Sequence, residues 1–237
     1  MLMKTVIQKS QERGHADHGW LNSYHSFSFA NFYDPQKVRF GLLRVLNDDY
    51  VAGGQGFGMH PHDNMEIVTI PLSGALQHRD SMGNSSIIKK GDVQIMSAGT
   101  GIRHSEFNPS PTEAVTLLQI WVFPKLENVT PRYDQKTYSV EGRKNHFETV
   151  VAPDNKEALF INQDAWFSLG NFDTAKSATY KVNKAGNGVY VFVISGSIEA
   201  AGQILNERDA VGVTEADSIE IKSLSNAEVL LIEVPMD

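Results

Sequence analysis

Two short pairs of metal-binding side chains stand out in the sequence. His60-Pro-His62 places two imidazoles two residues apart, and His104-Ser-Glu106 does the same for an imidazole and a carboxylate. In a β-strand, side chains at i and i+2 point to the same face, so each pair offers two ligands to one point. Two such pairs on neighbouring strands of a small barrel would converge as three imidazoles and one carboxylate. That set suits a divalent Fe, Mn, Ni, Co, Cu or Zn ion, whereas Ca and Mg require more oxygen ligands.

A single His-x-His pair is weak evidence for a metal, because two accidental pairs in polar loops are the alternative. The surrounding pattern is more specific. Gly54-x5-His60-x-His62-x3-Glu66, followed by Gly74, resembles the first motif of the cupin superfamily, with one residue more than usual between Glu66 and Gly74.

The second pair lies in an even more specific run. Gly101-x2-His104-x3-Asn108 resembles the second cupin motif, although Ser97 stands where that motif usually has proline. The whole run Gly91-Asp-Val-Gln-Ile-Met-Ser-Ala-Gly-Thr-Gly-Ile-Arg-His-Ser-Glu-Phe-Asn108 resembles the signature of the pirin family, whose bacterial members include quercetin 2,3-dioxygenases. Residues 12–21, 25–35 and 78–84 extend the match. The resemblance is dense in the N-terminal half and only an outline in the C-terminal half.

The pirin resemblance implies one metal site and a role for each ligand. Its ligands would be His60, His62, His104 and Glu106, with Glu106 also acting as the base that takes the proton of a flavonol hydroxyl. Glu66 occupies a position that is a ligand in many other cupins, but here a buried acceptor near the site, or a partner for a ligand imidazole N–H, is the better interpretation. The cofactor implied is one divalent transition metal ion, iron first, with manganese, nickel, cobalt, copper or zinc as alternatives.

The other histidines carry weaker signals. His15, His18 and His25 match the family pattern, but their spacing gives no common strand face, so a structural role is favoured over catalysis. His78 precedes the predicted hairpin turn Asp80–Asn84 and is expected either to line the pocket or to cap the hairpin. His146 is expected at the surface.

Four further side chains, Phe27, Phe29, Phe57 and Met59, could line an apolar substrate cavity. Core packing is the alternative for each, and the sequence does not decide between them.

The pattern of the whole chain predicts an all-β fold. Short runs rich in Val, Ile, Thr and aromatic residues recur between Gly, Asn and Asp turns, as strands of a sandwich or barrel do. The predicted strands include 38–46, 66–72, 86–89, 93–97, 117–123, 189–194 and 229–234. Only 164–170 and 155–160 offer a short helical turn.

An internal repeat divides the chain in two. Residues 66–76 resemble 188–198, and residues 115–122 resemble 228–234. With the family resemblance, this predicts a bicupin with two β-barrel domains of the double-stranded β-helix type: residues 1–130 with the metal, and 131–237 as a degenerate cupin. Residues 124–136 are the expected connector. Counting along the repeat puts Val182, Lys184, Ile221 and Ser223 in place of the ligands, and these cannot hold a divalent ion.

The amino-acid composition limits the kinds of partner and chemistry that the protein can have. The 237 residues carry 21 Lys and Arg against 28 Asp and Glu, a formal charge of −7, and no cysteine. The acidic balance disfavours direct nucleic-acid binding, and the missing thiols exclude disulfides, thiolate catalysis and iron–sulfur clusters. No stretch approaches the ~18 apolar residues of a membrane span. Residues 1–10 lack the apolar core of a secretory signal, so a cytoplasmic protein is expected.

Three functions remain to be weighed. The first is a metal-dependent dioxygenase that opens the ring of a flavonol such as quercetin with O₂. The second is a metal- or redox-responsive regulatory protein of the pirin type, which would bind a protein partner. The third, a cupin isomerase or hydrolase that uses the metal as a Lewis acid, lacks the pirin-specific run and is disfavoured.

Overall fold

Nearly all regular structure in the computed structural model, which describes residues 3–237, is β-strand. The exceptions are two single 3-10 turns, η1 (Ser10–Glu12) and η2 (Glu141–Arg143). Within residues 3–237 no α-helix occurs, and no helix is long and apolar enough to cross a membrane. Met1 and Leu2, part of the stretch tested for a secretory signal, lie outside the described residues.

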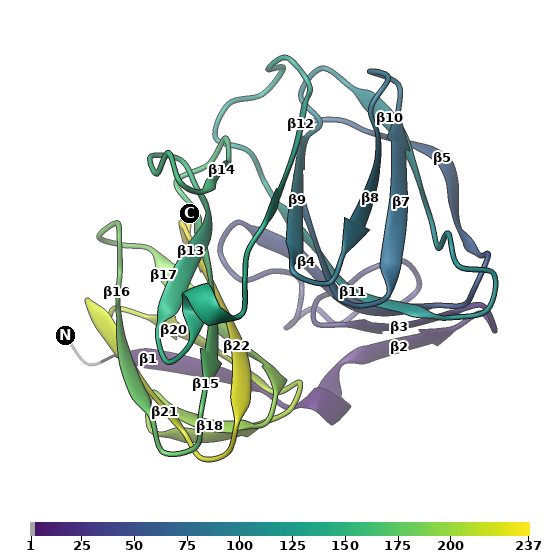
Figure 1. The fold of residues 1–237 in the computed structure, drawn as a ribbon. Helices are drawn as coiled ribbons and strands as arrows, with labels where there is room; N and C mark the ends of the chain where they lie inside the picture. The colour runs from purple at the N-terminus through teal and green to yellow at the C-terminus, as the bar shows by residue number, and fades with distance from the viewer. Residues whose placement is uncertain (1–2) are drawn as a thin grey trace.

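The first half of the chain forms a seven-stranded and a four-stranded sheet, which lie together in one part of the molecule (Figure 1). In order across the larger sheet, the strands are β12 (Arg132–Thr137), β9 (Asp92–Ser97), β6 (Glu66–Ser73), β11 (Val115–Val122), β4 (Leu43–Val51), β3 (Leu21–His25) and β2 (Gly14–Asp17). Across the smaller sheet they are β5 (Gly56–His62), β10 (Ile102–Phe107), β7 (Ala75–Asp80) and β8 (Ser85–Lys89).

The second half repeats this plan with its own pair of sheets. The larger sheet contains β1 (Lys4–Gln8), β20 (Ala210–Thr214), β17 (Gly188–Ser195), β22 (Ala227–Val234), β15 (Trp166–Phe172), β13 (Phe147–Ala152) and β14 (Leu159–Phe160). The smaller contains β16 (Ser177–Lys181), β21 (Ser218–Ser223), β18 (Ser197–Ala200) and β19 (Gln203–Asn206). The equivalent sheet orders agree with the repeat found in the sequence.

The two halves exchange one edge strand each. Strand β1 crosses to the second half and pairs with β20, and β12 stays with the first half and pairs with β9 (Figure 1). The predicted connector 124–136 was therefore wrong in its last residues, because Arg132–Lys136 are hydrogen-bonded to β9. The division of the chain at residues 130 and 131 stays a prediction, and the sheets do not follow it at these two strands.

The two large sheets pack against each other and share one hydrophobic core. Alternate side chains of a strand face opposite sides of its sheet, so one set of side chains from each strand enters this core. Leu118 and Ile120 of β11 pack in the same cluster as Phe167 of β15 and Leu230 of β22. The intervening residues of β11 face the interior of the first half, where Leu117 belongs to a separate cluster. Both faces of these strands are thus buried, which explains their nearly continuous apolar runs.

Six of the seven predicted strands are present with ends within two residues of the prediction, and the seventh overlaps an observed strand only in part. The largest difference is at 38–46, where the strand is β4, Leu43–Val51. Both predicted helical turns are wrong. Residues 166–170 lie in β15, paired with β22, and Leu159–Phe160 is β14, so pairing between distant strands overrides the local preference.

Candidate metal centre and active site

Strands β5 and β10 bring three imidazoles together. The strands pair antiparallel with His60 opposite His104, and His62 opposite Ile102. The ring centres are 4.4 Å apart for His60 and His104, and 4.9 Å apart for His62 and either of the others. One ring nitrogen of each residue lies within 4.8 Å of the other two. The same-face geometry expected from the sequence therefore converges here.

Glu106 lies beside this cluster in a different grouping. A β-bulge between His104 and Glu106 shifts the register of β10 against β5. A carboxylate oxygen of Glu106 and one ring nitrogen each of His104 and His78 lie within 4.8 Å of one another. Glu106 does not form such a cluster with His60 and His62. Its place as the fourth ligand stays a prediction.

Burial sets the protonation of these groups. Burial, followed by the nearby His60 and His62, lowers the pKa of His104 to about 2. Burial and His60 lower the pKa of His62 to about 4. Burial raises the pKa of Glu106 to about 7, and the charge of Asp49 adds to the rise. At neutral pH, His62 and His104 are therefore neutral and offer lone pairs, as metal ligands must.

Two unpartnered atoms show that the cluster fits a metal ion. His104 Nε2 and Glu106 Oε1 are both buried and hydrogen-bond to no described residue. A buried polar atom without a partner is costly, so each needs a ligand that the protein itself does not supply. Imidazole nitrogens with a carboxylate oxygen are suitable donors for a divalent transition metal.

The structure places Glu66 as a buried acceptor. Its side chain is fully buried on β6, where Oε2 accepts hydrogen bonds from Ser97 Oγ at 2.8 Å and from the Asn162 backbone N–H at 3.1 Å. It contacts no imidazole through a hydrogen bond. The serine that replaces the usual proline of the second cupin motif thus has a defined partner.

His78 and the hairpin turn have separate roles. The turn is capped by Asp80, whose Oδ1 accepts the backbone N–H groups of Met82 and Asn84 at 2.9 and 3.0 Å. His78 is fully buried on β7, with Nε2 3.1 Å from Asp80 Oδ2 and Nδ1 3.4 Å from His104 Nδ1. It therefore neither caps the hairpin nor lines the cavity.

A cavity of about 520 Å³ opens beside the histidine cluster. Phe29 and Phe57 line it as expected, whereas Phe27 packs in the shared core and Met59 is half exposed. Sequence reasoning missed two tryptophans of the wall, Trp20 and Trp121, and the Trp121 ring lies edge-to-face with both Phe29 and His62.

A row of four buried polar side chains crosses the larger sheet beside the cavity, and three of them, His25, Asn47 and Gln119, line it. His25, Asn47, Gln119 and Thr69 are successive cross-strand partners on β3, β4, β11 and β6. His25 Nδ1 lies 2.9 Å from Asn47 Oδ1, and Thr69 donates to Gln119 Oε1 at 3.1 Å. Gln119 Nε2 then donates to Glu106 Oε2 at 2.9 Å. This row fixes the orientation of the Glu106 carboxylate and leaves Oε1 free.

Asp49 adds a second buried carboxyl group to the cavity wall. It accepts a hydrogen bond from the Ser23 hydroxyl, and burial raises its pKa to about 7. Strand alternation could have revealed Gln119 and Trp121, because they share the face opposite Leu118 and Ile120. Asp49 has no comparable signal in the sequence.

The remaining histidines lie away from the cluster. His15 is exposed and stacks on Tyr24, and His18 is an exposed residue on the rim of the cavity. His146 is exposed, as expected. His25 is the exception among the N-terminal three, because its buried ring reaches the cavity wall.

In the second half, the place of Trp121 in the repeat is taken by Glu233. This buried carboxylate accepts hydrogen bonds from the Tyr180 hydroxyl at 2.8 Å and from Asn183 and Asn187 side chains at 2.9 and 3.0 Å. Val182 and Lys184 fall beyond the end of β16. Both groups of potential metal ligands found among residues 3–237 lie in the first half.

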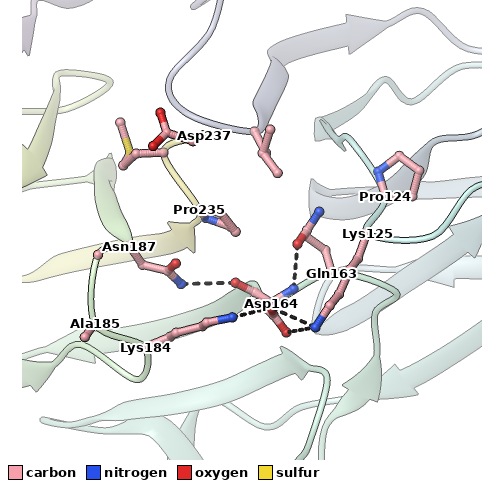
Figure 2. A pocket seen from close by; sticks show the side chains of 12 residues that line it. Pro124, Lys125, Gln163, Asp164, Lys184, Ala185, Asn187, Pro235 and Asp237 are labelled. Atoms are coloured by element: carbon pink, nitrogen blue, oxygen red, sulfur yellow. Dashed lines mark hydrogen bonds and ion pairs between the residues drawn. The ribbon is translucent and has the colours of Figure 1, made fainter.

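A second cavity, of about 450 Å³, has different chemistry. Figure 2 shows Lys125 and Lys184 both paired with Asp164 at its wall. Asn187 donates to the Asp164 backbone carbonyl at 3.0 Å. The cations are already neutralised in part, and no histidine lines this cavity, so it is not the candidate active site.

Paired β-sheets with a histidine cluster on β5 and β10 of the smaller sheet define a cupin-type protein, and the comparisons identify the family. The pirin family model matches residues 6–122, and the model described as the quercetinase C-terminal cupin domain matches residues 149–234. The chain belongs to the pirin family and contains two cupin-type domains.

Individual relatives extend over nearly the whole chain. A quercetin 2,3-dioxygenase of Escherichia coli K12 is 42% identical over 97% of this chain and 98% of its own length. A pirin-like protein of Caulobacter vibrioides is 40% identical over 93% and 95%. The crystal structure of the bacterial pirin YhhW from Escherichia coli in complex with nickel(II) has a TM-score of 0.93 at 41% identity, covering 98% of this chain and 99% of that one.

Proposed function

We propose that the protein is a metal-dependent dioxygenase that opens the ring of a flavonol such as quercetin with O₂. The observation that carries the proposal is the free Oε1 of Glu106, buried beside the imidazole cluster at the wall of an aromatic cavity. The names of the curated relatives support the same reaction class. Residues 1–130 hold the site in this proposal, and residues 131–237 act as scaffold.

His60, His62, His104 and Glu106 would hold one divalent ion, iron by expectation. When bound, the ion supplies positive charge that acidifies a flavonol hydroxyl and makes the enolate available to O₂. As neutral ligands, the three imidazoles would not change the net charge of a bound ion, whereas the Glu106 carboxylate would lower the net charge of the site by one.

Glu106 accepts the hydroxyl proton of the substrate at Oε1. Gln119 holds Oε2 by a hydrogen bond, so the base has one orientation before substrate arrives. The pKa near 7 belongs to the metal-free site; a bound ion would lower it, and would acidify the flavonol hydroxyl as well, so the proton transfer would stay feasible.

The aromatic wall binds and orients the flat rings of a flavonol. The rings of Trp121 and Phe29 are nearly perpendicular, at 86°, with their centres 5.5 Å apart. A flat substrate ring can therefore stack on one of them and meet the edge of the other. The cavity volume lies in the range that accommodates a drug-sized ligand, ~300–1,000 Å³. Closely packed rings also exclude water from the reacting enolate.

The test uses an aerobic flavonol assay on metal-saturated protein, with metal analysis of protein purified without added metal. Glu106→Gln keeps the shape of the side chain but removes its basicity, and should lower kcat by ~10²–10⁴ while a flavonol still binds. Glu66→Gln is the matched control, because Glu66 is equally buried and lies outside the cavity wall. It should retain near-normal turnover.

Near-normal turnover by saturated Glu106→Gln would assign the base to water or to another cavity residue. If the metal-loaded wild-type protein consumed no flavonol under air, the dioxygenase proposal would be wrong. Binding of a protein partner that changes with the oxidation state of the metal would then favour the regulatory function.

A further inference from the structure

A chain of three buried side chains leads from the hairpin turn to the imidazole cluster. Asp80 Oδ2 lies 3.1 Å from His78 Nε2, and His78 Nδ1 lies 3.4 Å from His104 Nδ1. His104 Nε2, at the opposite side of its ring, has no protein partner. The chain therefore ends at the atom that would bind a metal ion.

Only one order of protons makes every contact in this chain favourable. A carboxylate accepts, so His78 Nε2 must carry the proton that it donates to Asp80. In a neutral His78, Nδ1 is then an acceptor and requires a proton on His104 Nδ1. A neutral His104 with its proton on Nδ1 has its lone pair on Nε2, the form that binds metal. The reverse order would face a lone pair of His78 against the Asp80 carboxylate and place a proton on His104 Nε2.

We propose that His78 and Asp80 are positioning residues that hold His104 in its metal-binding tautomer and orientation. This inference rests on the metal site of the proposed function. A histidine placed between a ligand imidazole and a carboxylate extends the usual arrangement, in which the ligand donates directly to the carboxylate.

The packing around the chain fixes the positions of Asp80 and His78. Asp80 cannot turn away, because Oδ1 accepts two backbone N–H groups of the hairpin turn and Oδ2 also accepts Asn84 Nδ2 at 2.8 Å. His78 is held between strands by Tyr133 of β12, whose ring stacks on it with centres 4.6 Å apart. Both side chains of the His78–Asp80 pair are fully buried.

The first test needs no variant of His78 and no metal. Nitrogen-15 chemical shifts of the metal-free wild-type protein report which ring nitrogen of each histidine is protonated. We expect a proton on Nδ1 of His104 and on Nε2 of His78. A proton on Nε2 of metal-free His104 would overturn the proposal.

The second test measures nickel(II) affinity by competition with a chelator. His78→Phe keeps a ring against Tyr133 but removes both hydrogen bonds, and should weaken affinity ~10–100-fold, as loss of a ligand's hydrogen-bond partner does. His78→Asn places an amide oxygen near the position of Nδ1 and should recover most of that loss. His146→Phe, the same change at an exposed histidine, is the control and should bind as the wild type does.

The electronic spectrum of the nickel-loaded proteins supplies an independent reading of ligand geometry. It should shift in His78→Phe and return toward wild type in His78→Asn. Unchanged affinity and spectrum in His78→Phe would overturn the proposal while leaving the metal site intact. A wild-type protein that binds neither nickel(II) nor iron(II) would instead contradict the proposed function, so the two failures are distinguishable.

Discussion

The raised pKa of Glu106 predicts that ionisation of this buried side chain lowers the free energy of unfolding of the metal-free protein. Burial raises this pKa from an ordinary 4.5 to about 7, and one unit corresponds to ~1.4 kcal/mol. The folded state therefore binds more protons than the unfolded state between these two values. The free energy of unfolding falls as the pH rises through this window, and the loss for Glu106 alone totals ~3 kcal/mol.

Glu106→Gln removes this ionisation without changing the side-chain shape. In metal-free protein, the stability of the variant relative to the wild type should increase by ~3 kcal/mol between pH 4 and pH 9, with most of the change between pH 5 and 7. Asp49 and Glu66, whose pKa values also lie near 7, are present in both proteins and largely cancel in the difference. Urea unfolding of chelator-treated protein across this pH range measures the effect.

Saturating metal should make the wild type more stable than Glu106→Gln at high pH, the opposite of the metal-free proteins. The reason is that metal stabilises the folded wild type more than a variant with a weaker site. Glu66→Gln should show a similar pH dependence in the metal-free state but keep wild-type metal affinity. A Glu106→Gln stability difference that does not change with pH would refute the reasoning, since it would show that Glu106 titrates alike in the folded and unfolded states.

Three further substitutions test the metal ligands, the buried carboxylate of the second half and the cavity wall separately. His62→Ala should weaken metal affinity ~10-fold or more, because it removes one of the three clustered imidazoles, and full metal occupancy by competition titration would contradict the assignment. Glu233→Ala should lower the free energy of unfolding by ~3 kcal/mol or more, because it leaves the buried donors of Tyr180 and Asn187 without their acceptor, yet metal content should not change. Trp121→Phe shortens the aromatic wall beside Phe29 and should raise the KM for a flavonol, and an unchanged KM would contradict the role of this wall in substrate binding.

Local spacing was sufficient to predict much of this protein. The i, i+2 placement of His60 and His62 fixes them to one face of a strand, because the period of a strand is two. Alternation and turn residues likewise predicted the all-β fold, and the repeat predicted two equivalent halves. These features depend on neighbours in the chain, so they can be read without knowing what packs against them.

What lies opposite each strand was decided only by the tertiary structure. The register of β5 against β10 sets His60 beside His104, and the pairing of distant strands brings Gln119 of β11 within hydrogen-bond distance of Glu106. The exchange of β1 and β12 between the halves follows from hydrogen bonds between distant segments, which leave no periodic trace in the sequence. The chain from Asp80 through His78 to His104 has the same origin. Its members become adjacent because β7 pairs with β10, and pairing of strands this far apart is set by the packing of the whole sheet rather than by any local preference.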